Sequence, residues 1–276
     1  MNAWDWISAE PAPIIVTDDM THALDLHEYK TDNQILLRRS DSPNDLDLKV
    51  FEFFKSKGID KGYYIECGAN NGIFQSNTFL LEQIGWTGML IEADPKLTQS
   101  CRHFRKNNII HNAALVNSSY ASPTIEGMFS KFYSITAEEL EQRADTMTDE
   151  KRKEFFSKIY HSILTGHISE EVYDDYEEIS EHYEKKSVPA STLTSVLQMY
   201  NVKPWAIDFF SLDVEGMELD VLDGLGLKHY RPKYILTEVT NLSKTAPDEI
   251  HSFMANNNYK QVASFDAGHD IMFEAQ

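Results

Sequence analysis

The sequence predicts an α/β fold with a mostly parallel sheet, and three observations support this prediction. Five short apolar runs alternate with stretches whose apolar residues recur at helical spacing. A glycine-containing turn at residues 68–72 follows the first run, and an acid ends the second. Two further apolar runs, joined by Ala267-Gly268-His269, close the sequence and indicate an antiparallel hairpin. Strands that alternate with helices favour a sheet that is covered on both faces.

The first half of this pattern begins with a helix expected at residues 47–58. Its apolar side chains recur at helical spacing, and Gly58 is a common helix stop. The following segments are then expected to be, in order, strand, helix, strand, helix and strand: "GYYIECG", "NTFLLEQIG", "TGMLIEADP", "KLTQSCRHFRKN" and "IIHNAALVN".

The alternation resumes near residue 190 after an interruption. A helix, a strand, a helix, a strand and a helix are expected from "STLTSVLQMYNV", "AIDFFSLDVEG", "MELDVLDGLG", "KYILTEVT" and "DEIHSFMANNN". The terminal hairpin is expected in "YKQVASFDAGHDIMFEA", which brings the predicted sheet to seven strands.

Three parts of the chain differ in character. Residues 1–45 are expected to form an irregular arm that could include short helices, and residues 46–276 are expected to form the main domain. Residues 121–186 interrupt that domain and are expected to form a helical insertion, because residues 138–186 are charged and aromatic and have almost no Gly or Pro. The insertion would serve as a lid over the site or as a surface for self-association. The formation of a homodimer is therefore left as an alternative.

Charge and cysteine content exclude several classes of protein. The 276 residues include 44 acids and 25 bases, a net charge of −19, which disfavours binding to nucleic acid or to anionic lipid. Cys67 and Cys101 are too few for a disulfide framework. The N-terminus has no signal-peptide pattern, and no apolar run approaches the ~20 residues of a membrane span. A cytoplasmic location is therefore expected.

The glycine turn and the acid after it suggest a ligand that contains a ribose. Gly68 and Gly72 permit a tight turn at the end of the first strand, and Glu92 ends the second strand, where a carboxylate can accept both ribose hydroxyls. A dinucleotide fingerprint requires a glycine where this chain has Asn70. S-adenosylmethionine, which carries no phosphate, is therefore preferred.

Such a ligand needs polar partners for its amino acid end and space for its base. Glu66 is expected to bind the ammonium group. Asn70, Ser76 and Asn77, followed by Thr78, are candidates for the carboxylate. At the base, Ala113 leaves room for adenine and Asn112 can bond its edge, while Ala93 joins the set beside Glu92.

Carboxylates at two later strand ends are the candidates for catalysis. Asp213 and Glu215 in "SLDVEG" are two residues apart and would share one face of an extended strand. Glu238 ends the fifth strand. Asp213 is expected near the reacting centre, with Glu215 or Glu238 as base or orienting group. The same three acids could instead hold a divalent cation, and this alternative stays open.

Several long segments together resemble the FkbM family of S-adenosylmethionine-dependent methyltransferases. They are "YYIECGANNGIFQSNTFLLEQIGWTGMLIEADP", "STLTSVL", "DFFSLDVEGMELDVLDGL" and "YILTEV", within about residues 42–118 and 187–240. The resemblance implies a class I methyltransferase fold. A terminal hairpin is typical of the seven-stranded sheet of that fold. It also implies methyl transfer to a hydroxyl of a sugar or another small natural product. The arm and the insertion have no counterpart and are expected to select the acceptor.

Two other readings remain open from the sequence. Glu92 would suit an NAD(P)-dependent oxidoreductase or epimerase equally well, although Asn70 and the terminal hairpin disfavour it. A non-catalytic binding protein that has kept the fold is the third reading.

Overall fold

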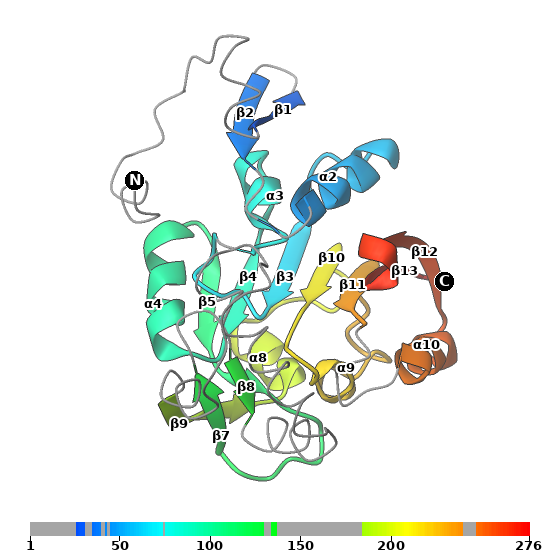
Figure 1. Ribbon diagram of the computed structural model, residues 1–276. Helices are drawn as coiled ribbons and strands as arrows, with labels where there is room; N and C mark the ends of the chain where they lie inside the picture. Colours follow the sequence, from blue (N-terminus) through cyan, green and yellow to red (C-terminus); the bar gives the residue numbers. More distant parts are fainter. Residues whose placement is uncertain are drawn as a thin grey trace, which may run out of the picture.

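The computed structural model describes residues 26–30, 35–39, 42, 45–73, 75–129, 134–136, 184–239 and 247–276. Its main sheet has seven strands in the spatial order β12-β13-β11-β10-β3-β4-β5 (Figure 1). These strands are β3 (Tyr63–Cys67), β4 (Thr87–Glu92), β5 (Ile109–Asn112), β10 (Phe209–Leu212), β11 (Tyr234–Glu238), β12 (Tyr259–Phe265) and β13 (Asp270–Ala275).

The pairing of these strands confirms the predicted mostly parallel sheet and its terminal hairpin. The five strands from β5 to β11 pair in parallel, whereas β13 is antiparallel to both β11 and β12. The hairpin does not simply extend the edge, because β13 lies between β11 and β12. The strand order reverses between β3 and β10, and ligands of open α/β sheets bind at the carboxyl side of such a reversal.

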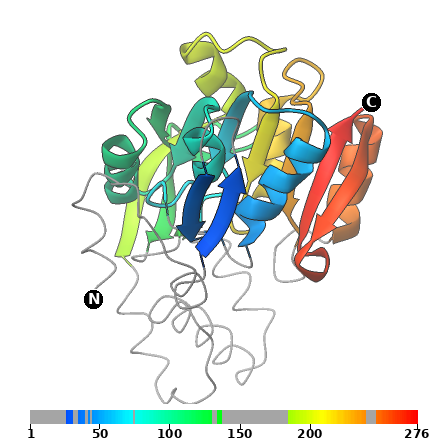
Figure 2. The same ribbon diagram turned by 90° about the horizontal axis from the view of Figure 1, so that it is seen from above.

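Helices cover both faces of the sheet. One face packs against α2 (Leu46–Ser56), α3 (Phe79–Gln83) and α4 (Pro95–Phe104), and the other packs against α8 (Leu193–Met199), α9 (Glu218–Leu225) and α10 (Pro247–Asn256). In Figure 2, α2 (blue) lies in front of the sheet and α10 (orange) lies behind it. The result is the three-layer arrangement that the strand and helix alternation predicts.

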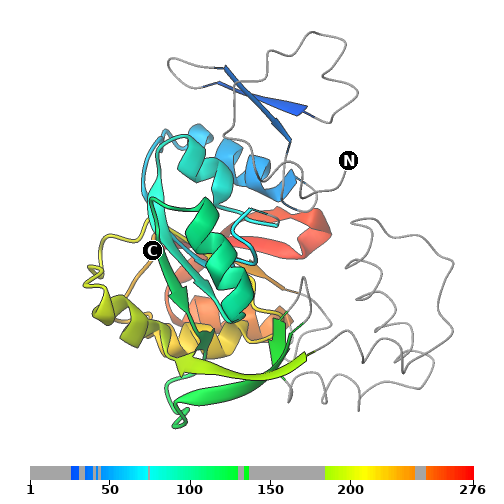
Figure 3. The ribbon, with the colours of Figure 1, turned by 90° about the vertical axis from the view of Figure 1, so that its left-hand side faces the viewer.

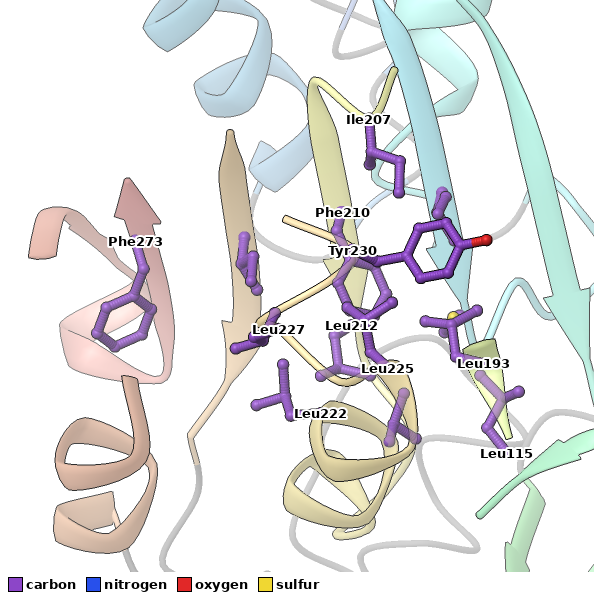
Figure 4. Packing of buried hydrophobic residues seen from close by; sticks show 14 of the residues in the cluster. Leu115, Leu193, Ile207, Phe210, Leu212, Leu222, Leu225, Leu227, Tyr230 and Phe273 are labelled. Atoms are coloured by element: carbon purple, nitrogen blue, oxygen red, sulfur yellow. The ribbon is translucent and has the colours of Figure 1, made fainter. Parts of the chain in front are cut away.

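The strands supply two separate cores because successive side chains point to opposite faces. Tyr64 and Phe209 belong to the core beneath α2 and α3, while their neighbours Ile65 and Phe210 belong to the core beneath α8 and α9. Figure 4 shows the second core, where side chains of β10 pack against those of α9 and the residues that follow it. Burial on both faces explains why these strands read as continuous apolar runs.

The residues 121–186 were expected to be helical, and their described ends are strands instead. An accessory sheet has the order β6-β9-β7-β8, and its strands are β6 (Ala114–Leu115), β7 (Thr124–Phe129), β8 (Ser134–Thr136) and β9 (Glu184–Ser191). Figure 3 shows β7 and β9 (green and yellow-green) running side by side below the green helix α4. The sequence did not indicate β9 because this strand contains two successive lysines and Pro189, and prolines are depleted in strands. The helices expected over 138–183 lie outside the described residues.

Two other expectations change in detail. The third expected strand divides at Ala113, with β5 in the main sheet and β6 in the accessory sheet. The arm was expected to be irregular, yet β1 (Leu26–Lys30) and β2 (Ile35–Arg39) form an antiparallel hairpin. Residues 1–25 lie outside the described ranges. Within those ranges no helix combines the length and the apolar character needed to cross a membrane.

Candidate active site

A pocket lies at the carboxyl ends of β3, β4 and β10, where the strand order reverses. Of the residues predicted to bind the cofactor or to act in catalysis, seven line this pocket: Gly68, Asn70, Glu92, Ala93, Ala113, Asp213 and Glu215. The pocket is completed by residues that sequence reasoning did not select: Gln75, Ile91, Leu97, Ala114, Leu115, Ile125, Gly127, Phe129, Val188, Val214 and Met217.

Gly68 allows the loops after β3 and β10 to approach each other. Its φ of 79° lies in the left-handed region, and a Cβ at this position would collide with the backbone carbonyl oxygen of Asp213. The backbone N–H of Asp213 donates to the carbonyl of Cys67, 3.2 Å away, and extends the strand pairing into the loops. The predicted glycine is therefore required by this close approach of two backbones at the pocket.

Glu92 connects the end of β4 with the glycine loop. One carboxylate oxygen accepts the backbone N–H of Asn70 at 2.9 Å, and the other accepts that of Asp94 at 2.8 Å. Burial raises the pKa of Glu92 to about 7, although these backbone hydrogen bonds act in the opposite direction. Glu92 is thus a fixed carboxylate that can change its charge near neutral pH.

The acids after β10 and β11 form a group with shared electrostatics. Burial raises the pKa of Asp213 well above its ordinary value, and the carboxylates of Glu238, Glu215 and Asp270 raise it further. Glu238 and Asp270 are direct partners across the β11–β13 pair. Glu238 does not line the pocket, so it acts on Asp213 through its charge.

The loop that carries Glu215 differs from the extended strand that was expected. β10 ends at Leu212, and Glu215 has a left-handed φ of 56°, so strand alternation does not decide where its side chain lies. Glu218, the first residue of α9, accepts the backbone N–H groups of Val214 and Gly216 at 3.2 and 3.1 Å. Glu218 therefore holds the loop in the conformation that places Asp213 and Glu215 at the pocket.

Glu66, the expected partner of the ligand's ammonium, is engaged within the protein. It is buried and does not line the pocket. Its carboxylate accepts hydrogen bonds from the Ser76 hydroxyl (3.0 and 2.9 Å), the Asn77 backbone N–H (2.7 Å) and the Thr78 hydroxyl (2.7 Å). These contacts assign Glu66 to holding the loop of residues 76–78 beneath the pocket rather than to touching a ligand.

Four other predicted binding residues also lie outside the pocket lining. Ser76 and Asn77 hold Glu66, and the Asn77 amide also donates to the Ser211 hydroxyl at 3.1 Å. Gly72 packs against α4. The Asn112 amide nitrogen lies 2.9 Å from both the Glu92 and the Ala93 carbonyl oxygens. Asn112 therefore fixes the backbone around the acid.

Sequence reasoning missed Arg105, which organises this region. Its guanidinium is fully buried and donates to Glu82, to the carbonyl of Gly72 (2.7 Å) and to the hydroxyl of Tyr64 (2.7 Å). It also donates to the hydroxyls of Ser76 (3.1 Å) and Thr78 (3.0 Å), and one nitrogen lies 3.7 Å from Glu66. A basic residue just after a helix gives no sequence signal for such a role.

Among the described residues, no group of three or more His, Cys, Asp or Glu side chains is placed to hold a metal ion. Cys67 and Cys101 are both buried free thiols, and burial raises the pKa of each.

Comparison with known proteins adds the family. The model described as "Methyltransferase FkbM domain" matches residues 66–260. No curated protein matches the chain. Among solved structures, the chain is similar to a SAM-dependent methyltransferase from Aquifex aeolicus (9% identity, 84% of this chain and 91% of that chain, TM-score 0.37). It is also similar to a Pyrococcus horikoshii protein (9% identity, 95% and 99% of the two chains, TM-score 0.39).

Both TM-scores are below 0.5, so the assignment rests on the family model, which covers the chain from the end of β3 to the start of β12. That family does not support the NAD(P)-dependent oxidoreductase reading. The chain belongs to the FkbM family of methyltransferases, and its methyl donor is S-adenosylmethionine.

Proposed function

We propose that this protein transfers a methyl group to a hydroxyl oxygen of a sugar or another small natural product. The observation that carries the proposal is the carboxyl group of Asp213, which lines the pocket and whose pKa is raised by burial and by neighbouring acids. A carboxylate with a raised pKa is a stronger base, so it can take the proton that a hydroxyl loses. The acceptor class follows the family resemblance.

The pocket lining fits the donor. Glu92 ends β4 within the lining, and a carboxylate offers about four acceptor positions, which backbone N–H groups and ribose hydroxyls can share. Ile91, Leu97 and Ala113 line the same pocket with apolar surface that suits adenine. The base and the ribose would therefore lie beside β4, and the reactive end would lie toward Asp213.

The acids around Asp213 favour a cation. S-adenosylmethionine supplies an electrophilic methyl group on a positively charged sulfur. The carboxylates of Glu238, Glu215 and Asp270 act on Asp213 as negative charges, and a nearby cation lowers the pKa of a carboxyl group. Asp213 would therefore lose its proton when the donor binds and become ready to act as a base.

The proton transfer and the methyl transfer would both take place beside Asp213. Asp213 accepts the hydroxyl proton while the acceptor oxygen bonds to the methyl carbon and the bond from that carbon to sulfur breaks. The products are a methyl ether, a neutral thioether and a protonated Asp213. Alignment of oxygen, carbon and sulfur is the main requirement, and the loop fixed by Glu218 supplies a rigid place for Glu215 to orient the acceptor.

Turnover with labelled donor tests the proposal. The full chain, S-adenosylmethionine labelled in its methyl group and a panel of glycosides and phenols should give products that are heavier by one CH₂. Asp213→Asn should abolish turnover yet still bind S-adenosylhomocysteine in calorimetry. Glu52→Gln, an exposed change on α2, should leave turnover unchanged. Methylation confined to amines, or normal turnover by Asp213→Asn, would contradict hydroxyl transfer with Asp213 as base.

A further inference from the structure

One face of the accessory sheet forms a wall of the donor pocket. Ile125, Gly127 and Phe129 alternate along β7 and therefore share a face, and all three line the pocket. Across the β7–β9 pair, Val188 lies opposite Ile125 and Lys186 lies opposite Gly127. Val188 also lines the pocket, so the face that these five residues share is turned toward the donor.

Lys186 ties this face to the acid at the end of β4. Its ammonium lies 3.0 Å from a carboxylate oxygen of Asp94, and the side chains are only 18% and 3% exposed. The other oxygen of Asp94 caps α4 by accepting two backbone N–H groups, and the Asp94 N–H donates to Glu92. The same ammonium lies 5.2 Å from the centre of the Phe129 ring. Lys186 therefore contacts both the pocket wall and the neighbour of Glu92.

We propose that the accessory sheet is the adenine wall of the donor site, with Phe129 stacking on the base and Lys186 as the residue that positions Phe129 and Asp94. This proposal rests on the donor binding in the pocket described above. A flat purine would lie between the aromatic ring of Phe129 and the apolar surface of Leu97 and Ala113. Strands that interrupt the methyltransferase sheet would then contribute to donor binding, in addition to the acceptor selection expected of this region.

Calorimetry on the full chain tests the role of the ring. Phe129→Ala should weaken S-adenosylhomocysteine binding about tenfold to a hundredfold, the range for losing an aromatic stacking partner of a base. Phe129→Leu, which keeps an apolar group in this buried position, should show a similar loss, whereas Phe129→Tyr should restore binding. Methylthioadenosine, which lacks the amino acid end, should lose the same factor as S-adenosylhomocysteine.

The two adjacent lysines of β9 offer a matched pair for the positioning role. Lys186→Met should weaken binding and shift its pH midpoint upward, since the charge of Asp94 would then act unopposed on Glu92. Lys185→Met is the control. Lys185 pairs with Glu126 at 2.6 Å, and both side chains are more than half exposed at 57% and 62%. This control should bind as the wild type does.

Two outcomes would overturn the proposal and are distinguishable. If the wild type binds S-adenosylhomocysteine and both Phe129→Ala and Phe129→Leu bind it equally well, the accessory sheet is not the adenine wall, although the donor site stands. If the wild type itself fails to bind, the donor site and this inference fall together. An equal pH shift in the Lys185 and Lys186 variants would remove the positioning role of Lys186.

Discussion

Replacing Arg105 with methionine should destabilise the fold severely and disorder the glycine loop. The guanidinium is fully buried, and its contacts include Glu82, Glu66 and the carbonyl of Gly72. Methionine has a similar length but provides no donor and no charge. The variant therefore leaves the buried carboxylate of Glu66 and the partly buried carboxylate of Glu82 without their cation, and a loop carbonyl without its hydrogen bond.

The expected magnitude follows from these contacts. Removing one partner of a buried ion pair costs about 3–5 kcal/mol, because the remaining charge stays buried. At roughly 2–4 °C per kcal/mol for a domain of comparable size, the melting temperature should fall by about 6–20 °C. Burial raises the pKa of Glu66, whereas the charge of Arg105 lowers that pKa. Without Arg105, Glu66 should take up a proton more easily, so the loss of stability in the variant should be smaller at acidic pH.

Thermal unfolding followed by circular dichroism measures this loss. Arg102→Met is the control, because Arg102 is exposed in the last turn of α4, just before Arg105, and its replacement should change stability little. Adding Glu82→Gln to the Arg105→Met variant should recover part of the loss, since it removes one of the stranded charges. A loss below about 1 kcal/mol for Arg105→Met would refute the role assigned to the guanidinium.

Two further changes probe the pocket. Gly68→Ala should abolish S-adenosylhomocysteine binding, because its Cβ would collide with the Asp213 carbonyl. Gly58→Ala has a similar φ of 70° but no atom within 4 Å of its Cβ, so it should cost only about 1–2 kcal/mol and bind normally. Equal binding by the two variants would contradict this close approach. Affinity for S-adenosylhomocysteine should rise with pH through about 7, because ionised Glu92 accepts the ribose hydroxyls. Because the pKa of Glu92 is raised from 4.5 to about 7 in the folded protein, the free energy of unfolding should fall as pH rises through this range. The full loss should be about 3 kcal/mol. Glu92→Gln should lose both pH dependences, and a persistent binding midpoint would exclude Glu92 as their source.

The centre of the main sheet could be predicted from the sequence because its central strands are buried on both faces. Such strands read as apolar runs, as Tyr63–Cys67 and Phe209–Leu212 do. The insertion of β13 between β11 and β12 could not be read this way, because an apolar run does not specify which strand it pairs with.

The pocket could be predicted where function coincides with a strand end. Gly68, Glu92 and Asp213 were found because the carboxyl ends of parallel strands meet at one edge of the sheet. Glu66 also lies near a strand end, but it is two residues from Tyr64 and therefore points to the same face of the sheet, toward the core beneath α2 and α3. On that face it lies close to Arg105. The partner that occupies it comes from a distant helix end, which local patterns do not reveal.

The accessory sheet shows a different limit of prediction. The pocket face of β7 includes Gly127, and β9 includes Pro189 and paired lysines, so neither strand has the uniform apolar alternation that marks a core. A strand face that lines a ligand pocket leaves room for the ligand. Its composition is therefore set partly by a molecule that the sequence does not contain.

The position of β13 has a consequence for the order in which the sheet can be completed. β11 pairs directly with β13, which comes later in the chain than every other strand of the sheet. During synthesis, the edge of β11 therefore stays without its final neighbour until residues 270–275 leave the ribosome, and unpaired edges readily recruit other chains. The acids Glu238 and Asp270 lie directly opposite each other on this late-forming pair, so the two charges that act on Asp213 from outside the pocket lining are brought into place last.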